Sequence, residues 1–212
     1  MKKMIKLILT LSKPNSIFSL HHNYEKEFYK CVESWRKNAG WLKDIEIHVA
    51  TDYNFKCNIK NVFIHYIENL NLGERRFNYS VVHVAGAYFQ KLFPKDTLIH
   101  IDIDMYCTKP IPISFLKVKR CLIERYNNFE ESRERLKILE KLNIKQMVNT
   151  DFIITKPGCK FYEEYIEKFK ELKQVEESDF WSFEELVADI VVHENKYNVV
   201  GEEEICANYD FV

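Results

Sequence analysis

Thr97-Leu98-Ile99-His100-Ile101-Asp102-Ile103-Asp104-Met105 is a short apolar run that carries two aspartates two residues apart. Side chains alternate between the two faces of a strand, so this spacing predicts that Asp102 and Asp104 point the same way, together with His100. Two carboxylates held side by side repel each other, and burying them without partners is costly. We therefore expect both aspartates to lie where the strand leaves the sheet, with a divalent cation between them.

The chemistry of this pair indicates the kind of cation. Ligand sets made only of oxygen atoms suit Mg²⁺ or Mn²⁺, which also keep coordination positions open for substrate phosphates. The alternative is that Asp102 and Asp104 are ordinary strand-end residues that meet solvent or a lysine such as Lys109. The almost wholly apolar run before the pair, and Cys107-Thr108-Lys109-Pro110 after it, favour the metal site.

Composition excludes several classes of protein. The chain has 212 residues, 46% of them hydrophobic, and only five glycines, which is typical of one globular domain with a sizeable core. A net charge of −1 argues against a nucleic-acid coat and against a polybasic membrane anchor. The sequence contains no apolar run long enough to predict a membrane span.

Six scattered cysteines indicate a reducing compartment. They show no C-x-x-C spacing, so we expect free thiols in a cytoplasmic protein, rather than a disulfide framework or a zinc site; they are Cys31, Cys57, Cys107, Cys121, Cys159 and Cys206. The first eleven residues imitate a signal peptide, but Lys6 and Lys13-Pro14 interrupt the apolar run. We expect this segment to form the first strand.

Apolar periodicity predicts strands that alternate with helices, the pattern of an α/β domain with a mainly parallel central sheet flanked by helices. Expected strands cover 4–11, 45–51, 61–67, 97–105, 118–123 and 144–156, and expected helices cover 24–38, 75–93, 129–142, 161–172 and a last one opening at Ser182. Ligands of such sheets bind beyond the carboxyl ends of the strands. Thr10, Ser12 and Asp52 should therefore share one edge of the sheet with the aspartate pair.

Two features of the second half carry further predictions. The 129–142 segment reads as an amphipathic helix with Leu136, Leu139 and Leu142 facing inward, and its charges, including a Glu131–Arg135 pair, as a solvated face. Ser182 and Glu185 have the spacing of a capping box at the start of the last helix.

The order of these parts resembles the GT-A family of nucleotide-sugar glycosyltransferases. The run from Leu98 to Met105 resembles the strand that leads into the family's D-x-D motif, and Met147–Pro157 resembles its later strand, with Asp151 where the family has glycine. An acidic stretch from Asp179 to Glu185 precedes and opens the last helix. The family's His-x-x-Gly-x-x-Lys tail is absent. The compact length is also similar to small glycosyltransferase domains of large DNA viruses, which would place the chain in the host cytoplasm.

The resemblance implies a single domain over residues 1–212, with a nucleotide-binding half up to about residue 110 and a sugar and acceptor half after it. It implies a metal-dependent glycosyltransferase of hexosyltransferase type, using Mn²⁺ or Mg²⁺. The donor would be a nucleoside-diphosphate sugar, a UDP-sugar first of all, and the acceptor a hydroxyl of a glycan or glycoprotein. Asp104 would be the main metal ligand, and Asp102 would contact ribose, or the metal through water.

Other residues are assigned to the nucleotide by the same resemblance. Thr10, Leu11 and Ser12 at the end of the first strand, and Asp52 after the second, would line the base and ribose. Asp52 reads equally well as a turn residue. Arg75 or Arg76 could reach a phosphate or a sugar hydroxyl, with surface charge beside Glu74 as the alternative reading.

The catalytic residue has two candidates. An inverting transferase needs a general base, and Glu184 in the first turn of the last helix fits the family's position, with Asp179 as a fallback. The alternative role of Glu184 is a favourable interaction with the helix dipole. A retaining transferase needs a polar residue beneath the donor sugar, and Asp151 fits that description. An aspartate inside an apolar strand needs a partner in any case.

Other functions are possible for such a sequence, although a purely structural interaction protein would not explain the paired carboxylates. A sugar-phosphate nucleotidyltransferase would have a glycine-rich loop after the first strand, and Leu11–Ser16 contains no glycine. A non-catalytic nucleotide- or sugar-binding module would keep the fold without needing Asp104. His100 shares the face predicted for the aspartates but points inward from the edge, so we expect a hydrogen-bonded core histidine rather than a metal ligand.

Overall fold

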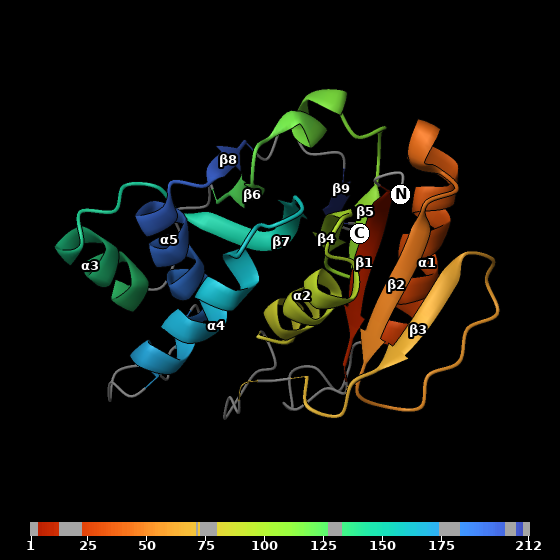
Figure 1. The fold of residues 1–212 in the computed structure, drawn as a ribbon, viewed down its shortest axis with the longest axis horizontal. Coiled ribbons are helices and arrows are strands. Elements are labelled where there is room, and N and C mark those ends of the chain that lie inside the picture. Colours follow the sequence, from red (N-terminus) through yellow and green to blue (C-terminus); the bar gives the residue numbers. More distant parts are fainter. Residues whose placement is uncertain are drawn as a thin grey trace.

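The computed structural model of the chain describes residues 4–12, 23–70, 72, 80–126, 133–173, 183–201 and, for the backbone alone, 207–209. A seven-stranded sheet in the order β3-β2-β1-β4-β7-β6-β8 runs through its centre (Figure 1). The strands are β1 (Ile5–Leu11), β2 (Glu46–Thr51), β3 (Val62–Tyr66), β4 (Thr97–Ile101), β6 (Cys121–Arg125), β7 (Val148–Thr155) and β8 (Asn198–Val200). A second sheet pairs β5 (Met105–Cys107) with β9 (Ala207–Tyr209) in antiparallel fashion.

Strand direction divides the main sheet into two parts. The strands β3, β2, β1 and β4 pair in parallel, whereas β7 runs antiparallel to both β4 and β6. Because β6 and β8 pair in parallel, every strand except β7 ends at the same edge of the sheet. The predicted α/β class with a mainly parallel central sheet is confirmed.

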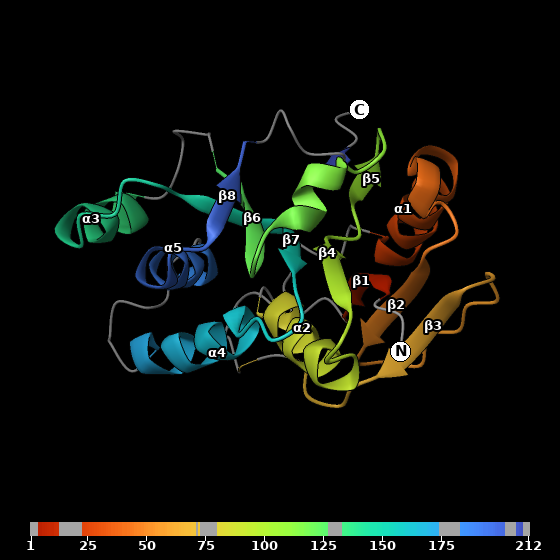
Figure 2. The same cartoon turned by 45° about the horizontal axis from the view of Figure 1, so that its top comes forward.

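Helices cover both faces of this sheet, as two views of the ribbon show (Figures 1 and 2). In the described parts of the chain they are α1 (Tyr24–Asn38), α2 (Val81–Leu92), α3 (Arg133–Lys141), α4 (Phe161–Leu172) and α5 (Phe183–Asn195), together with the short 3-10 helices η2 (Gly40–Leu42) and η3 (Ile113–Lys117). The core side chains of α1 pack with Leu7, Leu9 and Leu11, whereas those of α2 pack with Ile8. The alternation of β1 thus separates the two apolar layers.

Helix α1 shows how the sequence pattern becomes structure. Its buried residues Phe28, Cys31, Val32 and Trp35 recur at the three- and four-residue spacing of one helical face. The Asn23 side chain accepts a hydrogen bond from the backbone N–H of Lys26 at 3.0 Å and so caps the first turn. The predicted helix over 24–38 is confirmed.

Three predictions about elements need correction. The central strand ends at Ile101, and Ile103 and Asp104 lie in a turn before β5. Of the three leucines expected to face inward from α3, only Leu139 is buried, and Leu136 and Leu142 are 39% and 48% exposed. Arg135, predicted on the solvated face, is instead fully buried. Strands β8 and β9 were not predicted, because three residues are too few to show a period.

The described residues also bear on two simpler predictions. None of the helices in these parts of the chain is long and apolar enough to cross a membrane. Cys31, Cys107, Cys121 and Cys159 are buried free thiols, and Cys57 is half-buried and free. Cys206 lies outside the described residues. The cytoplasmic location stays a prediction.

Candidate functional site

The aspartate pair lies in the turn that joins β4 to β5. The backbone N–H of Met105 donates to the carbonyl of Asp102 at 3.2 Å, which closes the turn. Asp102 and Asp104 are both partly buried. The expected strand does not extend to the pair, because the chain turns after Ile101. That the two side chains point the same way stays a prediction. Their predicted place, where the strand leaves the sheet, is confirmed.

The antiparallel register of β7 with β4 brings Asp151 to this turn, at a bulge in the pairing of β7 with β6. Ile123 of β6 lies opposite Ile153, but the next residue, Glu124, lies opposite Asn149. Residues 150–152 therefore lack partners on β6, and such bulges redirect side chains. The backbone N–H of Asp102 donates to the carbonyl of Asp151 at 3.1 Å. Asp151 is predicted from the sequence as a catalytic residue, and the structure places it beside Asp102.

The carboxyl groups of Asp102 and Asp151 also share a hydrogen bond. The Asn149 side chain makes two hydrogen bonds with Asp151. Its Nδ2 donates to Asp151 Oδ2 at 2.7 Å, and its Oδ1 accepts from the Asp151 backbone N–H at 3.3 Å. Burial raises the pKa of Asp102 well above its usual range, and the charges of Asp151, Asp104 and Glu124 raise it further. Burial raises the pKa of Asp151 as well, against the hydrogen bond from Asn149.

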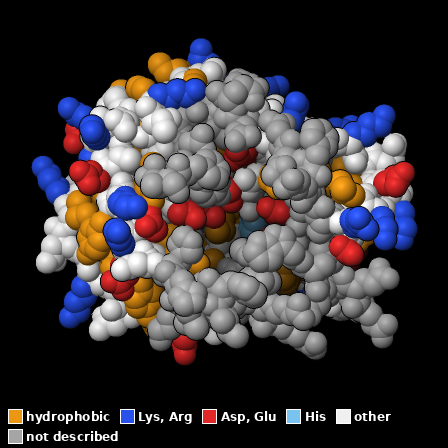
Figure 3. All heavy atoms as spheres, turned by 180° about the vertical axis from the view of Figure 1, so that it is seen from behind, with side chains coloured by type: hydrophobic (Ala, Val, Ile, Leu, Met, Phe, Trp, Pro, Cys, Tyr) orange, Lys and Arg blue, Asp and Glu red, His pale blue; other side chains and the backbone are white. Residues whose placement is uncertain are grey.

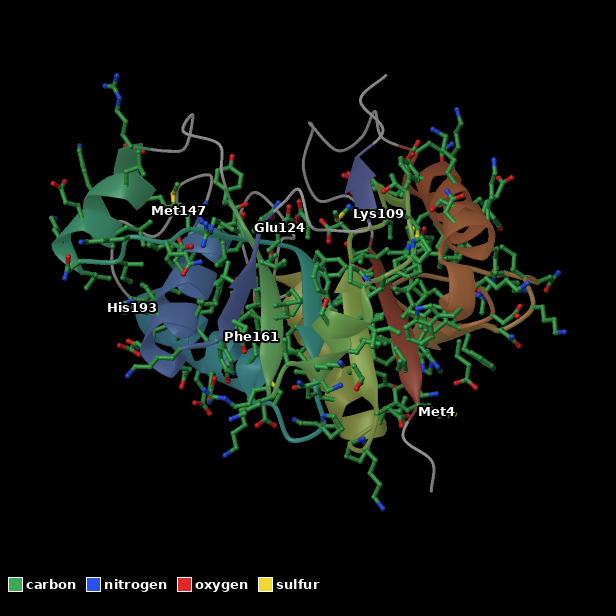
Figure 4. All side chains as sticks on the ribbon, turned by 90° about the horizontal axis from the view of Figure 1, so that it is seen from above. Met4, Lys109, Glu124, Met147, Phe161 and His193 are labelled. Carbon is green, nitrogen blue, oxygen red and sulfur yellow. The ribbon has the colours of Figure 1, made fainter. Side chains whose placement is uncertain are left out.

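Glu124 was not predicted as a site residue. It is only 5% exposed, ends the apolar part of β6, and its charge acts on Asp102. In Figure 4, Glu124, Met147 and Lys109 lie along one side of the molecule, whereas Met4 and Phe161 lie toward the other. Figure 3 shows the molecule from behind, and Asp and Glu side chains gather near the middle of the face seen there. A carboxylate that ends an apolar strand, as in Leu122-Ile123-Glu124, is the signal that could have found it.

Helix α1 begins close to the aspartates. Burial raises the pKa of Tyr24, and the charges of Asp104 and Asp102 raise it further, so the first residue of the helix lies within electrostatic reach of the pair. The same two charges act on the thiol of Cys31, whose pKa burial raises most. The sequence identifies both residues only as members of an apolar stripe.

The expected nucleotide-binding residues lie at the ends of β1 and β2. Leu11 and Thr51 are paired in register, so Ser12 and Asp52 follow on neighbouring strands. Ser12 and Asp52 are half-buried. The Leu11 side chain is fully buried in the core on the α1 face, so only its backbone can meet a ligand. The parallel register places Ile8 opposite His100 and hence Thr10 level with Asp102.

His100 is a core residue, as predicted. Its Nε2 is 3.1 Å from Thr10 Oγ1 and its Nδ1 is 3.2 Å from Tyr162 Oη, so both ring nitrogens are hydrogen-bonded. Burial lowers the pKa of His100 to about 3, which keeps the ring neutral. The imidazole therefore anchors the Thr10 side chain and is not available as a metal ligand.

The remaining predicted residues are less closely tied to the aspartates. Glu184 lies half-buried in the first turn of α5. Its neighbour Glu185, predicted as half of a capping box, accepts a hydrogen bond from Arg135 Nη1 at 2.7 Å. Ser182, the other half of the box, lies outside the described residues, as do Arg76 and Asp179.

The donor set fits a hard divalent cation that keeps most of its coordination sphere for other ligands. Among the described residues, no group of three or more His, Cys, Asp or Glu side chains is arranged to hold a metal ion. Asp102 and Asp104 offer two carboxylates in a turn where negative charge already accumulates, as the raised pKa of Asp102 indicates. Mg²⁺ and Mn²⁺ are commonly held by one or two carboxylates together with substrate phosphates.

Comparison with known proteins identifies the fold. No family model matches the sequence, and no curated protein sequence matches it either. Mouse xyloside xylosyltransferase 1 in its apo form is similar in structure, with a TM-score of 0.57 at 11% identity, over 93% of this chain and 84% of that one. The apo form of the glycosyltransferase GlyE of Streptococcus pneumoniae TIGR4 superposes with a TM-score of 0.56 at 9% identity.

The GlyE match covers 96% of this chain but 46% of GlyE, so the chain spans just under half the length of that protein. A second GlyE structure gives a TM-score of 0.55 at 10% identity, over 94% and 45% of the two chains. At these identities the likeness establishes the fold alone. The chain has the GT-A-like fold that solved glycosyltransferases share.

Proposed function

We propose that this chain is a metal-dependent glycosyltransferase that moves a sugar from a nucleoside-diphosphate sugar, a UDP-sugar first of all, to a hydroxyl of a glycan or glycoprotein. One observation carries the proposal. Asp102 and Asp104 occupy the turn after β4, at the edge where the parallel strands end, in a fold shared with solved glycosyltransferases. Ligands of parallel sheets bind at that edge.

The metal part of the proposal assigns Mn²⁺ or Mg²⁺ to Asp104, with Asp102 holding the ion through water or contacting the ribose. Bound there, the ion would neutralise charge on the diphosphate leaving group. Repulsion among Asp102, Asp104, Asp151 and Glu124 supports a cation at this place, because it is relieved when positive charge enters.

The nucleotide part assigns the base and ribose to the ends of β1 and β2. Thr10, Ser12 and Asp52, with the backbone of Leu11, would line this part of the site. The half-buried Asp52 carboxylate can accept an N–H of uracil, which is the reason to test UDP first. Arg76 is proposed for a phosphate or a sugar hydroxyl.

Two residues are proposed for the sugar transfer itself. Asp151 contacts Asp102 and would face the donor sugar, where it can accept hydrogen bonds from sugar hydroxyls. Glu184 would act as general base on the acceptor hydroxyl if the reaction inverts the anomeric centre. Of the two, Asp151 has the stronger support, because its contact with the aspartate turn is direct.

A thermal-shift panel tests the proposal. UDP, GDP and their common sugars are each added with Mn²⁺ or with EDTA to the wild type, to Asp104→Ala and to Asp44→Ala. Asp44 is an exposed residue before the amino end of β2, so Asp44→Ala is the matched loss of one aspartate elsewhere. We expect one nucleotide to stabilise the wild type and Asp44→Ala, only with Mn²⁺, and to leave Asp104→Ala unchanged.

The outcomes separate the candidate functions. Stabilisation that needs both Mn²⁺ and Asp104 supports the glycosyltransferase, and release of free sugar from the matching donor then identifies that sugar. Nucleotide binding that is indifferent to Mn²⁺ and to Asp104 contradicts the metal-dependent transferase and indicates a non-catalytic binding module. An absence of any shift with every nucleotide contradicts both.

A further inference from the structure

Arg135 lies in α3, yet its guanidinium is fully buried, and each of its three nitrogens donates a hydrogen bond. Nε and Nη2 donate to the two carboxylate oxygens of Asp189 at 2.8 and 3.0 Å. Nη1 donates to Glu185 at 2.7 Å. Asp189 of α5 is also almost completely buried. This is a bidentate ion pair, which fixes orientation as well as distance.

The ion pair binds both backbone groups of one residue of β7. Asp189 Oδ1 accepts a hydrogen bond from the N–H of Val148 at 2.7 Å, and Arg135 Nη2 donates to the carbonyl of Val148 at 2.9 Å. The N–H and C=O of one strand residue point to the same edge of that strand. Along this edge, two charged side chains therefore supply the hydrogen bonds that a neighbouring strand would supply.

This anchor lies directly before the part of β7 that reaches the acidic site. Val148 is followed by Asn149 and then by the bulge at 150–152, where pairing with β6 is interrupted. The regular pairing with β4 reaches Phe152, and the bond from the Asp102 N–H to the Asp151 carbonyl continues it by one residue. The segment that carries Asn149 and Asp151 is therefore held at one end by β4 and at the other by the anchor at Val148.

We propose that Arg135 and Asp189 are a positioning pair, which holds the start of β7 so that Asn149 and Asp151 are presented to the donor sugar. The proposal deepens the function proposed above and rests on it. The pair touches no substrate; it acts through the backbone of Val148. Buried ion pairs contribute little net stability compared with apolar residues of similar size, so a geometric role accounts better for this one.

The test variant replaces the pair without leaving a buried charge. Arg135→Met/Asp189→Leu removes both bonds to Val148 and fills the space with apolar side chains. Replacing Arg135 alone leaves the Asp189 carboxylate unpaired in the core, and replacing Asp189 alone leaves the buried guanidinium with Glu185 as its only carboxylate partner. Tyr197→Phe is the matched control. It removes the hydrogen bond between Tyr197 and Glu164, in the same apolar cluster, and leaves the bonds of Val148 in place.

Amide hydrogen exchange of the ligand-free protein is the first readout, because it does not depend on activity. We expect exchange in the peptide covering 147–152 to be roughly tenfold faster in the double variant than in Tyr197→Phe, with β1 and β2 unchanged in both. Equal exchange in the two variants would overturn the proposal. The exchange measurement tests the positioning pair even if the wild type binds no nucleotide. Absence of nucleotide binding would instead contradict the proposed function.

The second readout separates positioning from folding. We expect the double variant to bind UDP with Mn²⁺ as the wild type does, because Asp102 and Asp104 are untouched, while hydrolysis of the donor sugar slows roughly 10- to 100-fold. Tyr197→Phe should have the same UDP affinity and the same rate of donor hydrolysis as the wild type. If affinity and turnover of the double variant fall by the same factor, or if neither changes, Arg135 and Asp189 have only a structural role.

Discussion

The carboxyl groups of Asp102 and Asp151 share a hydrogen bond, and the backbones of the same two residues are joined by a second one of 3.1 Å. The turn after β4 and the bulge of β7 are thus joined by one backbone and one side-chain hydrogen bond. A hydrogen bond between two carboxyl groups uses the proton of one of them, so the pair carries one negative charge, and the nearby carboxylates of Asp104 and Glu124 repel it. The ligand-free site stores unfavourable electrostatic energy.

Asp151→Asn should therefore stabilise the ligand-free protein while impairing its chemistry. Removing one of the clustered negative charges is expected to add about 1 kcal/mol to the free energy of unfolding, or roughly 2–4 °C in Tm for a chain of this size. Calorimetry at pH 7 measures this, and donor hydrolysis should fall in the same variant. A loss of stability would mean that Asp151 is a structural residue of β7.

Gly86→Ala should destabilise the fold although alanine favours helices. A Cβ at Gly86 would come within 2.4 Å of the Tyr162 ring, and Tyr162 is bonded to His100. Overpacking of this kind costs roughly 1–3 kcal/mol, more than the gain of about 1 kcal/mol in helix propensity. Urea unfolding measures the net loss, and Gly86→Ala/Tyr162→Leu should recover part of it. An increase in stability for Gly86→Ala alone would contradict the close packing of α2 on α4.

Acid should destabilise the protein below pH 6.5. Burial, with the charge of Lys6, lowers the pKa of His48 to about 4, against the opposing influence of Glu46. Between pH 6.5 and 4 the unfolded chain protonates this imidazole and the folded chain does not, so stability falls as pH drops, by up to ~1.4 kcal/mol per pH unit.

His48→Phe isolates this contribution from that of the acidic site, whose raised pKa values act in the opposite direction. The phenyl ring keeps the stacking against Phe63 and removes the titrating group. The free energy of unfolding, measured in urea at pH 7, 6 and 5, should fall less steeply for the variant than for the wild type. Identical slopes would show that folding leaves the pKa of His48 unchanged.

The orientation of α3 can be tested with two leucines. Leu139 is 3% exposed and Leu136 is 39% exposed, although the sequence pattern places both on the inner face. Leu139→Ala should cost roughly 2–5 kcal/mol of unfolding free energy, and Leu136→Ala less than about 0.5 kcal/mol. Chemical denaturation of the two variants decides this. Equal losses would support the orientation expected from the sequence and remove Arg135 from the core.

Sequence reasoning succeeded where one periodic pattern spans an element. The stripe from Phe28 to Trp35 predicts α1, and the apolar runs of β1, β2 and β4 predict a parallel sheet, because burial of those runs is local information. The same reasoning placed Asp102 and Asp104 at the edge of the sheet. It did not predict the turn that holds them, because the backbone bond between Met105 and Asp102 is revealed by no period.

The parts of the site that depend on distant partners could not be predicted in the same way. Glu124 ends the apolar run of β6, but the sequence alone does not show that its charge reaches Asp102 on another strand. Arg135 reads as a surface charge because its partner Asp189 is 54 residues away. In both cases the tertiary contact, and not the local pattern, decides whether a charge is buried.

Isothermal titration of UDP into the wild type and Asp104→Asn, each in Mn²⁺ and in EDTA, tests the central claim most directly. Asparagine keeps the size of the side chain and removes only its charge. We predict that UDP binds the wild type in Mn²⁺, that EDTA abolishes this binding, and that Asp104→Asn weakens it by roughly tenfold or more. UDP binding of equal strength in all four titrations would contradict a metal–diphosphate site at the turn after β4.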